Sequence, residues 1–428
     1  MLSVEDNEIL TRTGPGTLMG TLLRRYWIPA LLSSELPRPD GPPVRLTLLG
    51  ERLVAFRDSE GKVGLVEEAC PHRLASLYFG RNEEGGLRCV YHGWKFDRHG
   101  RCLDMPSEPP ESNFKDKVRL TAYPCEERGG VVWTYMGPPE KRPPLPELEW
   151  ALVPPEHRYI TRRIQECNYF QALEGGIDSS HVSFLHRGDL HGLNVPSSSL
   201  SNDFLLRDTA PRFEVEPVEH GLLIAARRQA GPGQVYWRIT QFLMPWYTMV
   251  PPFADAPRGG HAWVPMDDEH CWTWSIDWHP LRPLSEEELN TLKGGYGIHM
   301  DLIPGTLRPV QNRDNDYLID RERQASGLSF SGIKGVAAED QALQESQGPI
   351  VDRSRERLGT SDAGIIAARR LMLKAARQLA QGDENLPGLR PESQRVRAAS
   401  LVLPEGVPFV EGAREALVSR PDVFVAAP

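Results

Sequence analysis

The sequence predicts an α+β protein whose first third is all β and whose remainder mixes strands with helices. In the first third, apolar and polar residues alternate in short runs that are separated by turn residues. A proline-rich stretch, residues 137–146, then interrupts any regular element. Beyond it, β-branched and aromatic runs are interspersed with longer segments of helical pattern. These observations predict two domains, residues 1–145 and 146–428.

The all-β part is predicted from four runs of strand-forming residues. Residues 43–57 alternate apolar and polar positions around a turn at residues 50–51, which is typical of a hairpin. The same criterion predicts further short strands at residues 63–67, 87–91 and 129–135.

The larger part is predicted from longer periodic segments. Residues 165–186 have a helical pattern with a glycine pair in the middle, and strand-like runs follow within residues 212–250 and 271–276. Residues 285–293 begin with a serine and three glutamates, which is typical of a helix start. The clearest helix pattern, rich in alanine, leucine and arginine, lies at residues 362–381.

Composition narrows the class of protein. At 428 residues the chain is long enough for two or three cores of about 150 residues each. The net charge of −9 argues against nucleic-acid binding. We find neither an export pattern nor a stretch of about 18 apolar residues, so we expect no membrane association. The six cysteines are spread along a long chain, which favours free thiols in a reducing cytoplasm.

Two mixed pairs of metal ligands give the most specific signal. Cys70 is two residues before His72, Cys89 is three residues before His92, and sixteen residues separate the pairs. A Rieske [2Fe-2S] cluster requires such pairs, because two thiolates bind one iron and two neutral imidazoles bind the other. A zinc site usually groups cysteine with cysteine and histidine with histidine, and chance histidines beside buried cysteines are the remaining alternative. The motif therefore predicts a Rieske cluster.

The neighbours of these ligands indicate the class of Rieske protein. Rieske proteins of respiratory complexes carry an additional cysteine in each cluster loop, and the two cysteines form a disulfide. Those places hold Ala75 and Tyr91 here, and Trp94 follows the second loop. The motif therefore resembles that of the oxygenases and ferredoxins. On this evidence alone the chain is an electron carrier and not yet an enzyme.

A second group of metal-binding residue types comprises Asp178, His181 and His186. Two histidines and a carboxylate form the facial triad of non-haem Fe(II) oxygenases. Asp178 and His181 would share one helix face, whereas His181 and His186 would point about 140° apart. We therefore expect the helix to widen or end near His186. Surface histidines are the alternative interpretation, and His191 is a weaker rival ligand.

The chain resembles the oxygenase α subunits of the Rieske non-haem iron aromatic-ring-hydroxylating oxygenases, and more narrowly their phthalate dioxygenase-like group. The resemblance covers nearly the whole chain, including the early segment RRYWIP and residues 332–350. It implies a mononuclear iron bound by His181, His186 and Asp340, with Glu339 as the competing carboxylate. It also implies a helix-grip (START/Bet v 1-like) catalytic domain, in which a bent antiparallel sheet surrounds a long helix.

Asp178 has two interpretations. As a ligand it would complete the triad locally. The resemblance implies instead that it hydrogen-bonds His181 and a cluster histidine, here His92, of a neighbouring subunit, and we expect this catalytic bridging role. It implies a homo-oligomer, a trimer or a hexamer of α subunits. Many members have an asparagine one turn earlier, where this chain has Glu174, so the role of that position is open.

The source of electrons is expected to be another protein. The chain has no Gly-x-Gly-x-x-Gly fingerprint and no plant-type ferredoxin cysteine run, so we expect that it cannot take hydride from a nicotinamide. The resemblance implies a separate NADH-dependent reductase of flavin and ferredoxin type, with O2 as co-substrate.

The substrate is expected to be aromatic. An aromatic carboxylate calls for an arginine in the pocket; Arg207 and Arg238 are the candidates, and the resemblance favours Arg207. Recognition of phthalate uses a second arginine where this chain has Met244, which favours a substituted benzoate or a more apolar arene. Alternatives to ring hydroxylation are monooxygenation, such as O-demethylation of an aryl ether acid, and a pure Rieske electron carrier.

Overall fold

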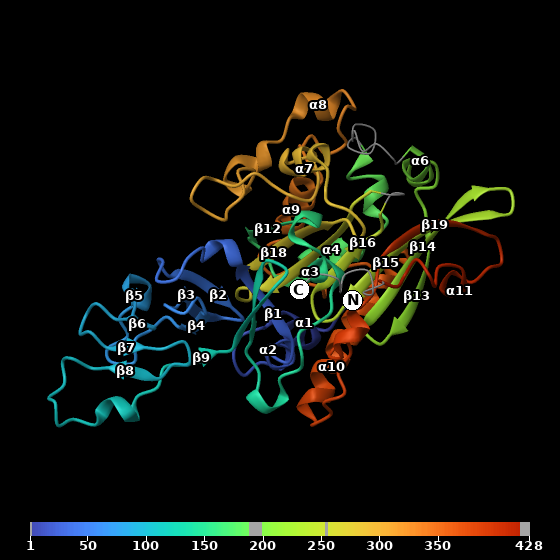
Figure 1. The fold of residues 1–428 in the computed structure, drawn as a ribbon. Coiled ribbons are helices and arrows are strands. Elements are labelled where there is room, and N and C mark those ends of the chain that lie inside the picture. The colour runs from blue at the N-terminus through green and yellow to red at the C-terminus, as the bar shows by residue number, and fades with distance from the viewer. Residues whose placement is uncertain (1, 188–198, 253–255, 420–428) are drawn as a thin grey trace. The chain divides into compact units, whose positions relative to one another are not determined.

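The computed structural model describes residues 2–187, 199–252 and 256–419 of the chain (Figure 1). The chain forms two compact units, residues 13–143 and residues 1–12 together with 144–428. The predicted first domain, residues 1–145, differs from the smaller unit chiefly in helix α1 (Val4–Thr11). This helix belongs to the larger unit because Asn168 donates a hydrogen bond to the Thr11 carbonyl at 3.0 Å.

The smaller unit contains three antiparallel sheets, whose strand orders are β1-β11-β10, β2-β3-β4-β9 and β5-β6-β7-β8. Its elements are α2 (Leu18–Leu23), β1 (Trp27–Leu32), β2 (Val44–Leu48), β3 (Glu51–Arg57), β4 (Val63–Glu67), β5 (Arg81–Glu83), β6 (Gly86–Arg88), β7 (Lys95–Phe96), β8 (Cys102–Asp104), β9 (Ala122–Tyr123), β10 (Cys125–Arg128) and β11 (Val131–Tyr135). The all-β prediction for this part is confirmed.

The predicted hairpin at residues 43–57 is confirmed as β2 and β3. Its turn is formed by Leu49 and Gly50, one residue earlier than predicted, and their φ angles are 49° and 80°. Two consecutive left-handed residues match the twist of the flanking strands, as in a type I′ turn. The predicted strand at residues 87–91 is shorter, because β6 ends at Arg88 and the chain turns at Cys89.

The larger unit is built on an antiparallel sheet of eight strands. Its order is β12-β18-β17-β16-β15-β14-β13, and β19 also pairs with β15 (Figure 1). The strands are β12 (Arg158–Gln165), β13 (Arg212–Val218), β14 (Gly221–Gly231), β15 (Gln234–Leu243), β16 (Tyr247–Val250), β17 (Arg258–Pro265), β18 (Cys271–Trp278) and β19 (Ala399–Pro404). The strands predicted within residues 212–250 and 271–276 are confirmed.

Helices complete the predicted α+β class. They are α3 (Glu149–Leu152), α4 (Tyr169–Ile177), α6 (Ser199–Arg207), α7 (Glu286–Lys293), α8 (Arg321–Ala325), α9 (Val336–Ser346), α10 (Ala363–Ala380) and α11 (Phe409–Gly412). Helices α3, α4, α6 and α10 contact this sheet. Helix α4 contacts β16, β17 and α9, and α10 contacts β13 and β14. Close approach of α10 depends on Gly364, where an added Cβ would lie 2.8 Å from Ile224 Cγ2. No helix in the described ranges is long and apolar enough to cross a membrane.

Candidate metal centres and substrate pocket

The four predicted cluster residues lie on two loops with the same backbone hydrogen bonds. In the first loop, the Cys70 N–H donates to Ala75 O, and the Leu74 N–H donates to Cys70 O. In the second, the Cys89 N–H donates to Trp94 O, and the Gly93 N–H donates to Cys89 O. Leu74 and Gly93 occupy equivalent places and both have positive φ, 60° and 79°. The two ligand pairs are therefore presented by two loops of like shape.

The side chains on these loops fit an iron-sulfur cluster. Cys70 and Cys89 are 1% and 3% exposed, and both belong to the core of the smaller unit. The rings of His72 and His92 lie 4.4 Å apart between centroids, and Trp94 stacks on His72. The buried Nδ1 of His92 has no hydrogen-bond partner among the described residues. A buried ring nitrogen without a partner is suited to binding a metal.

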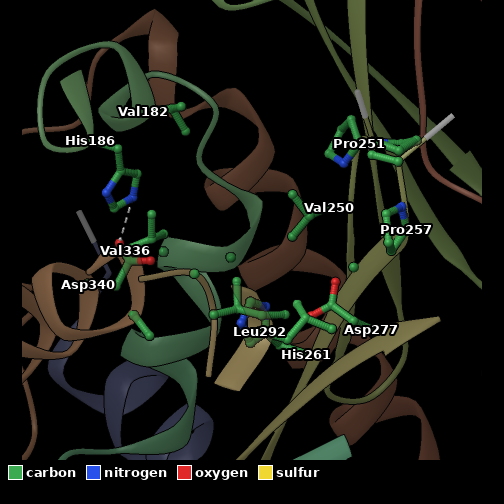
Figure 2. Close-up of a pocket in the computed structure, with 18 of the residues that line it drawn as sticks. Val182, His186, Val250, Pro251, Pro257, His261, Asp277, Leu292, Val336 and Asp340 are labelled. Carbon is green, nitrogen blue, oxygen red and sulfur yellow. Dashed lines mark ion pairs between the residues drawn. The ribbon is translucent and has the colours of Figure 1, made fainter. Parts of the chain in front are cut away.

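The predicted iron ligands of the larger unit converge on one point. The Nε2 atoms of His181 and His186 are 3.2 Å apart. Asp340 Oδ1, on α9, lies 3.4 Å from the first of these nitrogens and 3.3 Å from the second. One ligand atom from each residue falls within 4.8 Å of the other two. Figure 2 shows His186 and Asp340 facing each other across this point.

The outer nitrogens of both imidazoles face carboxylates. Asp178 Oδ2 lies 3.4 Å from His181 Nδ1. Glu339 Oε2 lies 2.7 Å from His186 Nδ1, and its other oxygen accepts a hydrogen bond from Ser331 at 2.5 Å. A carboxylate on the outer nitrogen fixes the tautomer and leaves Nε2 free for a metal. Glu339, the predicted competitor of Asp340, therefore faces the far side of the His186 ring from the point of convergence.

The electrostatics of the site favour a cation. His186 is buried, which by itself would lower its pKa, but the carboxylates of Asp340 and Glu339 raise the pKa of His186 to about 10. The site thus stabilises a positive charge beside these two carboxylates. A divalent iron supplies such a charge, and two imidazoles with one carboxylate are its usual protein ligands in non-haem oxygenases.

The local fold around these ligands differs from the predicted helix over residues 165–186. Helix α4 ends at Ile177, and His181 lies in a separate 3-10 turn, His181–Ser183. The helix ends because the Asp178 backbone is extended and its side chain accepts a hydrogen bond from the Ser180 N–H at 2.7 Å. This break allows His181 and His186 to point toward the same place, which a regular helix would prevent.

A cavity of about 550 Å³ lies against these ligands and is lined by all three of them. Its size suits a small aromatic molecule. Much of the remaining lining is apolar, and Figure 2 shows Val182, Val250, Pro251, Pro257, Leu292 and Val336 around it.

Two buried arginines line the cavity, and no carboxylate lies within ion-pair distance of either among the described residues. Arg163 Nε donates to Gln341 at 3.1 Å, and Arg163 Nη1 donates to Ser275 at 2.8 Å. Arg238 is less engaged: Nη1 donates to Ser179 at 3.2 Å, whereas Nε has no partner. An arginine that is 6% exposed and lacks a counter-ion is suited to an anionic ligand.

Arg207, the arginine that the resemblance favours for the substrate carboxylate, is not among the residues that line the cavity. Its side chain is 76% exposed and pairs with Asp203, one turn earlier on the solvent face of α6, at 3.3 Å. His191, the weaker rival iron ligand, lies outside the described residues.

Several polar residues of the cavity were not predicted from the sequence, among them Arg163, His261 and Asp277. All three lie on strands of the central sheet, and no short motif distinguishes them from other polar strand residues. Strand periodicity shows which residues share a face, but not which face borders a cavity.

Replacing Glu339 by glutamine should weaken iron binding about 10- to 100-fold, because an amide orients the His186 ring less well than a carboxylate does. Iron retained against a graded chelator measures the effect, with cluster absorbance as an internal reference. Glu322→Gln, an exposed change on α8, should leave iron affinity unchanged. Equal iron retention in both variants would show that Glu339 has no such role.

Comparison with known proteins agrees with both centres. Residues 26–124 match the Rieske [2Fe-2S] domain family, and residues 134–408 match the family described as LigXa C-terminal domain like. The chain is 43% identical over 411 residues to the 3-chlorobenzoate-3,4-dioxygenase oxygenase subunit of Comamonas testosteroni, covering 92% of this chain and 93% of that protein. It is 40% identical over 392 residues to the phthalate 4,5-dioxygenase oxygenase subunit of Pseudomonas putida, covering 90% and 88%.

A solved structure of dicamba monooxygenase has the same fold. It superposes with a TM-score of 0.59 at 18% identity and covers 84% of this chain and 99% of that one. The family matches, the two relatives and the two sets of ligands agree on one assignment. The chain belongs to the Rieske non-haem iron oxygenases, as an oxygenase subunit of the phthalate dioxygenase-like group that uses a [2Fe-2S] cluster, a mononuclear iron and O2.

Proposed function

We propose that this enzyme hydroxylates an aromatic monocarboxylate, with electrons from a separate NADH-dependent reductase. In this proposal Cys70, His72, Cys89 and His92 bind the cluster. The proposal rests on one observation. A single cavity is lined by three convergent residues that could bind iron and by a buried arginine that has no carboxylate partner among the described residues. The two relatives are named for a chlorobenzoate and for phthalate, both aromatic carboxylates.

The protein's residues orient the substrate and the ligands. His181, His186 and Asp340 would hold the iron, which would supply dioxygen activation, and the cluster would relay electrons from the reductase. Asp178 and Glu339 fix the two imidazoles through their outer nitrogens. The apolar lining excludes water from the ring of the substrate.

Arg238 binds the substrate carboxylate in this proposal. Burial lowers the pKa of Arg238, an effect that the charge of Asp178 partly offsets, so a bound carboxylate would supply a missing counter-charge. Ser179 holds Nη1 in place and leaves Nη2 without a hydrogen bond to any described residue. A guanidinium positioned in this way fixes the substrate carboxylate by charge-assisted hydrogen bonds.

Oxygen uptake with a phthalate-group reductase and NADH tests the proposal, with benzoates, hydroxybenzoates and methoxybenzoates as substrates. Arg238→Gln should raise KM for the acid that is turned over best by about 10- to 100-fold. This factor corresponds to the free energy that hydrogen bonds to a charged group usually contribute to binding. Arg207→Gln is the matched control and should leave KM unchanged, because that side chain is exposed. Equal KM values in the two variants would contradict the role of Arg238.

The same assay distinguishes the alternatives. Two new ring hydroxyls in the product indicate dioxygenation, whereas loss of a methyl group as formaldehyde indicates O-demethylation. About three irons per chain are expected for the oxygenase and about two for a pure electron carrier.

The cluster is proposed to serve a neighbouring copy of the chain, through His92 of one subunit and Asp178 of the next, in a trimer or hexamer. Apolar side chains flank the cluster loops and are strongly exposed in the single chain: Leu74 (74%), Val90 (58%) and Tyr91 (56%). Exposed apolar residues gathered in this way are typical of a protein interface.

Complementation tests this arrangement. His92→Ala and Asp178→Asn chains should each lose about 100-fold in turnover. Mixed oligomers that carry both chains, isolated through two different tags, should regain activity because an intact His92 then meets an intact Asp178. Mixed oligomers as inactive as either parent would refute transfer between subunits.

A further inference from the structure

A second polar group lies in the cavity wall formed by the central sheet. Gly259 of β17 pairs with Asp277 of β18, and His261 pairs with Ser275. The side chains of His261 and Asp277 therefore lie on the same face of the sheet. Figure 2 shows His261 and Asp277 in a different part of the cavity lining from His186 and Asp340. Neither residue has a place in the iron site or in the carboxylate site proposed for Arg238.

One carboxylate oxygen of Asp277 is fixed by a chain of hydrogen bonds through His299 to Thr161. Asp277 Oδ2 lies 2.9 Å from His299 Nε2, and His299 Nδ1 lies 2.6 Å from the Thr161 hydroxyl. Thr161 therefore holds the His299 ring in place, and His299 in turn holds Asp277 Oδ2. Asp277 Oδ1 has no hydrogen bond to any described residue, and no arginine or lysine in the described ranges forms an ion pair with Asp277.

His261 supplies a neutral imidazole beside this carboxylate. The residue is 9% exposed and its ring stacks on Trp263, with 4.9 Å between centroids. Burial and, to a lesser extent, the positive charge of Arg163 lower the pKa of His261 to about 3. No hydrogen bond joins either ring nitrogen to a described residue, and Nδ1 is fully buried. A neutral imidazole has one donor and one acceptor, and no described residue uses either of them.

We propose that Asp277 and His261 form a second polar subsite, which binds a hydroxyl or amino substituent on the ring of the aromatic acid. This inference rests on the proposed function, in which Arg238 binds the carboxylate of the same substrate. A neutral donor satisfies Asp277 Oδ1 and can also use His261, whereas a second carboxylate would be repelled by Asp277. The pocket therefore selects hydroxy- and aminobenzoates over both benzoate and aromatic dicarboxylates.

Gly259 leaves room for the substituent. An added Cβ there would lie 3.6 Å from Asp277 Oδ1, 3.9 Å from Ile298 Cδ1 and 4.0 Å from Val250 Cβ, all ordinary contact distances. Gly259→Ala would therefore place a methyl group in the subsite without displacing its neighbours. It offers a steric test that leaves the charge of Asp277 unchanged.

Calorimetric titration of the resting enzyme, loaded with cluster and iron, gives dissociation constants for benzoate, each hydroxybenzoate isomer and phthalate. The best hydroxybenzoate should bind at least about 10-fold more tightly than benzoate. In Asp277→Asn and in Gly259→Ala this ratio should fall to about 1, and phthalate should bind more tightly to Asp277→Asn than to the wild type. Glu286→Gln removes an exposed charge outside the cavity lining and should keep the ratio.

An unchanged ratio in Asp277→Asn or in Gly259→Ala would overturn the subsite, and so would a wild type that does not distinguish hydroxybenzoates from benzoate. If benzoates bind and are oxidised without such a preference, the subsite fails and the proposed function stands. If none of the acids binds, both fail. Circular dichroism and cluster absorbance would reveal whether Asp277→Asn has lost its fold. In that case Gly259→Ala still tests the subsite.

Discussion

Asp340→Asn should lose at least about 1,000-fold in turnover and should retain little mononuclear iron, while its cluster spectrum stays unchanged. Asp340 Oδ1 lies 3.4 Å and 3.3 Å from the two imidazole nitrogens, and in the proposed site it completes the donor set. An asparagine keeps the shape but removes the negative charge, which a dication requires. Loss of the several kcal/mol that a metal contributes to a transition state accounts for the expected factor.

Iron per chain by elemental analysis, cluster absorbance and oxygen uptake measure these three effects separately. Leu343→Ala, a change at a 46% exposed position on the same helix, is the control and should preserve iron and activity. If Asp340→Asn kept both its iron and its turnover, the ligand assignment would be wrong and another carboxylate would complete the site.

Glu174→Gln should lower the free energy of unfolding of the larger unit by about 3–5 kcal/mol and its melting temperature by about 10 °C. Arg353 binds both oxygens of Glu174 at 3.1 Å, and Arg369 binds Oε1 at 2.6 Å. Arg353 is fully buried and Arg369 is 3% exposed. Removing the carboxylate charge therefore leaves a buried cation without its counter-ion, which is the costly case for a buried pair.

The melting temperature of the larger unit, followed by circular dichroism, checks this result. Glu8→Gln breaks an exposed pair with Arg12 in the same unit and should cost less than about 1 kcal/mol. Similar shifts for the two variants would show that the Glu174 network contributes little. Because Glu174 binds both Arg353 and Arg369 of α10, it connects α4 with segments far along the chain.

Local sequence signals predicted the elements that local interactions determine. The left-handed turn of Leu49 and Gly50 sets the first hairpin, and Ser285 caps α7 through a reciprocal bond with Glu288. Helix α10 follows from its alanine-rich amphipathic pattern. In each case the stabilising groups are close in sequence, so the pattern alone was sufficient.

The sequence was less informative where a side chain competes with the backbone and where distant contacts decide. The helix predicted through residue 186 ends at Ile177, since the Asp178 side chain competes for backbone hydrogen bonds. The resemblance favours Arg207 over Arg238, whereas Arg238, on β15, is the one of the two that lines the cavity. His261 and Asp277 meet the cavity through strand pairing, which no short pattern encodes.

The partners of His186 have a consequence for the order in which the holoenzyme is assembled. Glu339, whose carboxylate is hydrogen-bonded to the outer nitrogen of His186, is 153 residues further along the chain. Asp340 follows Glu339 directly on α9. A nascent chain can therefore form no complete iron site until α9 has been synthesised and docked on α4. The cluster ligands all lie within residues 70–92. Cluster insertion can thus precede iron loading, and iron acquisition becomes the step that marks a finished catalytic unit.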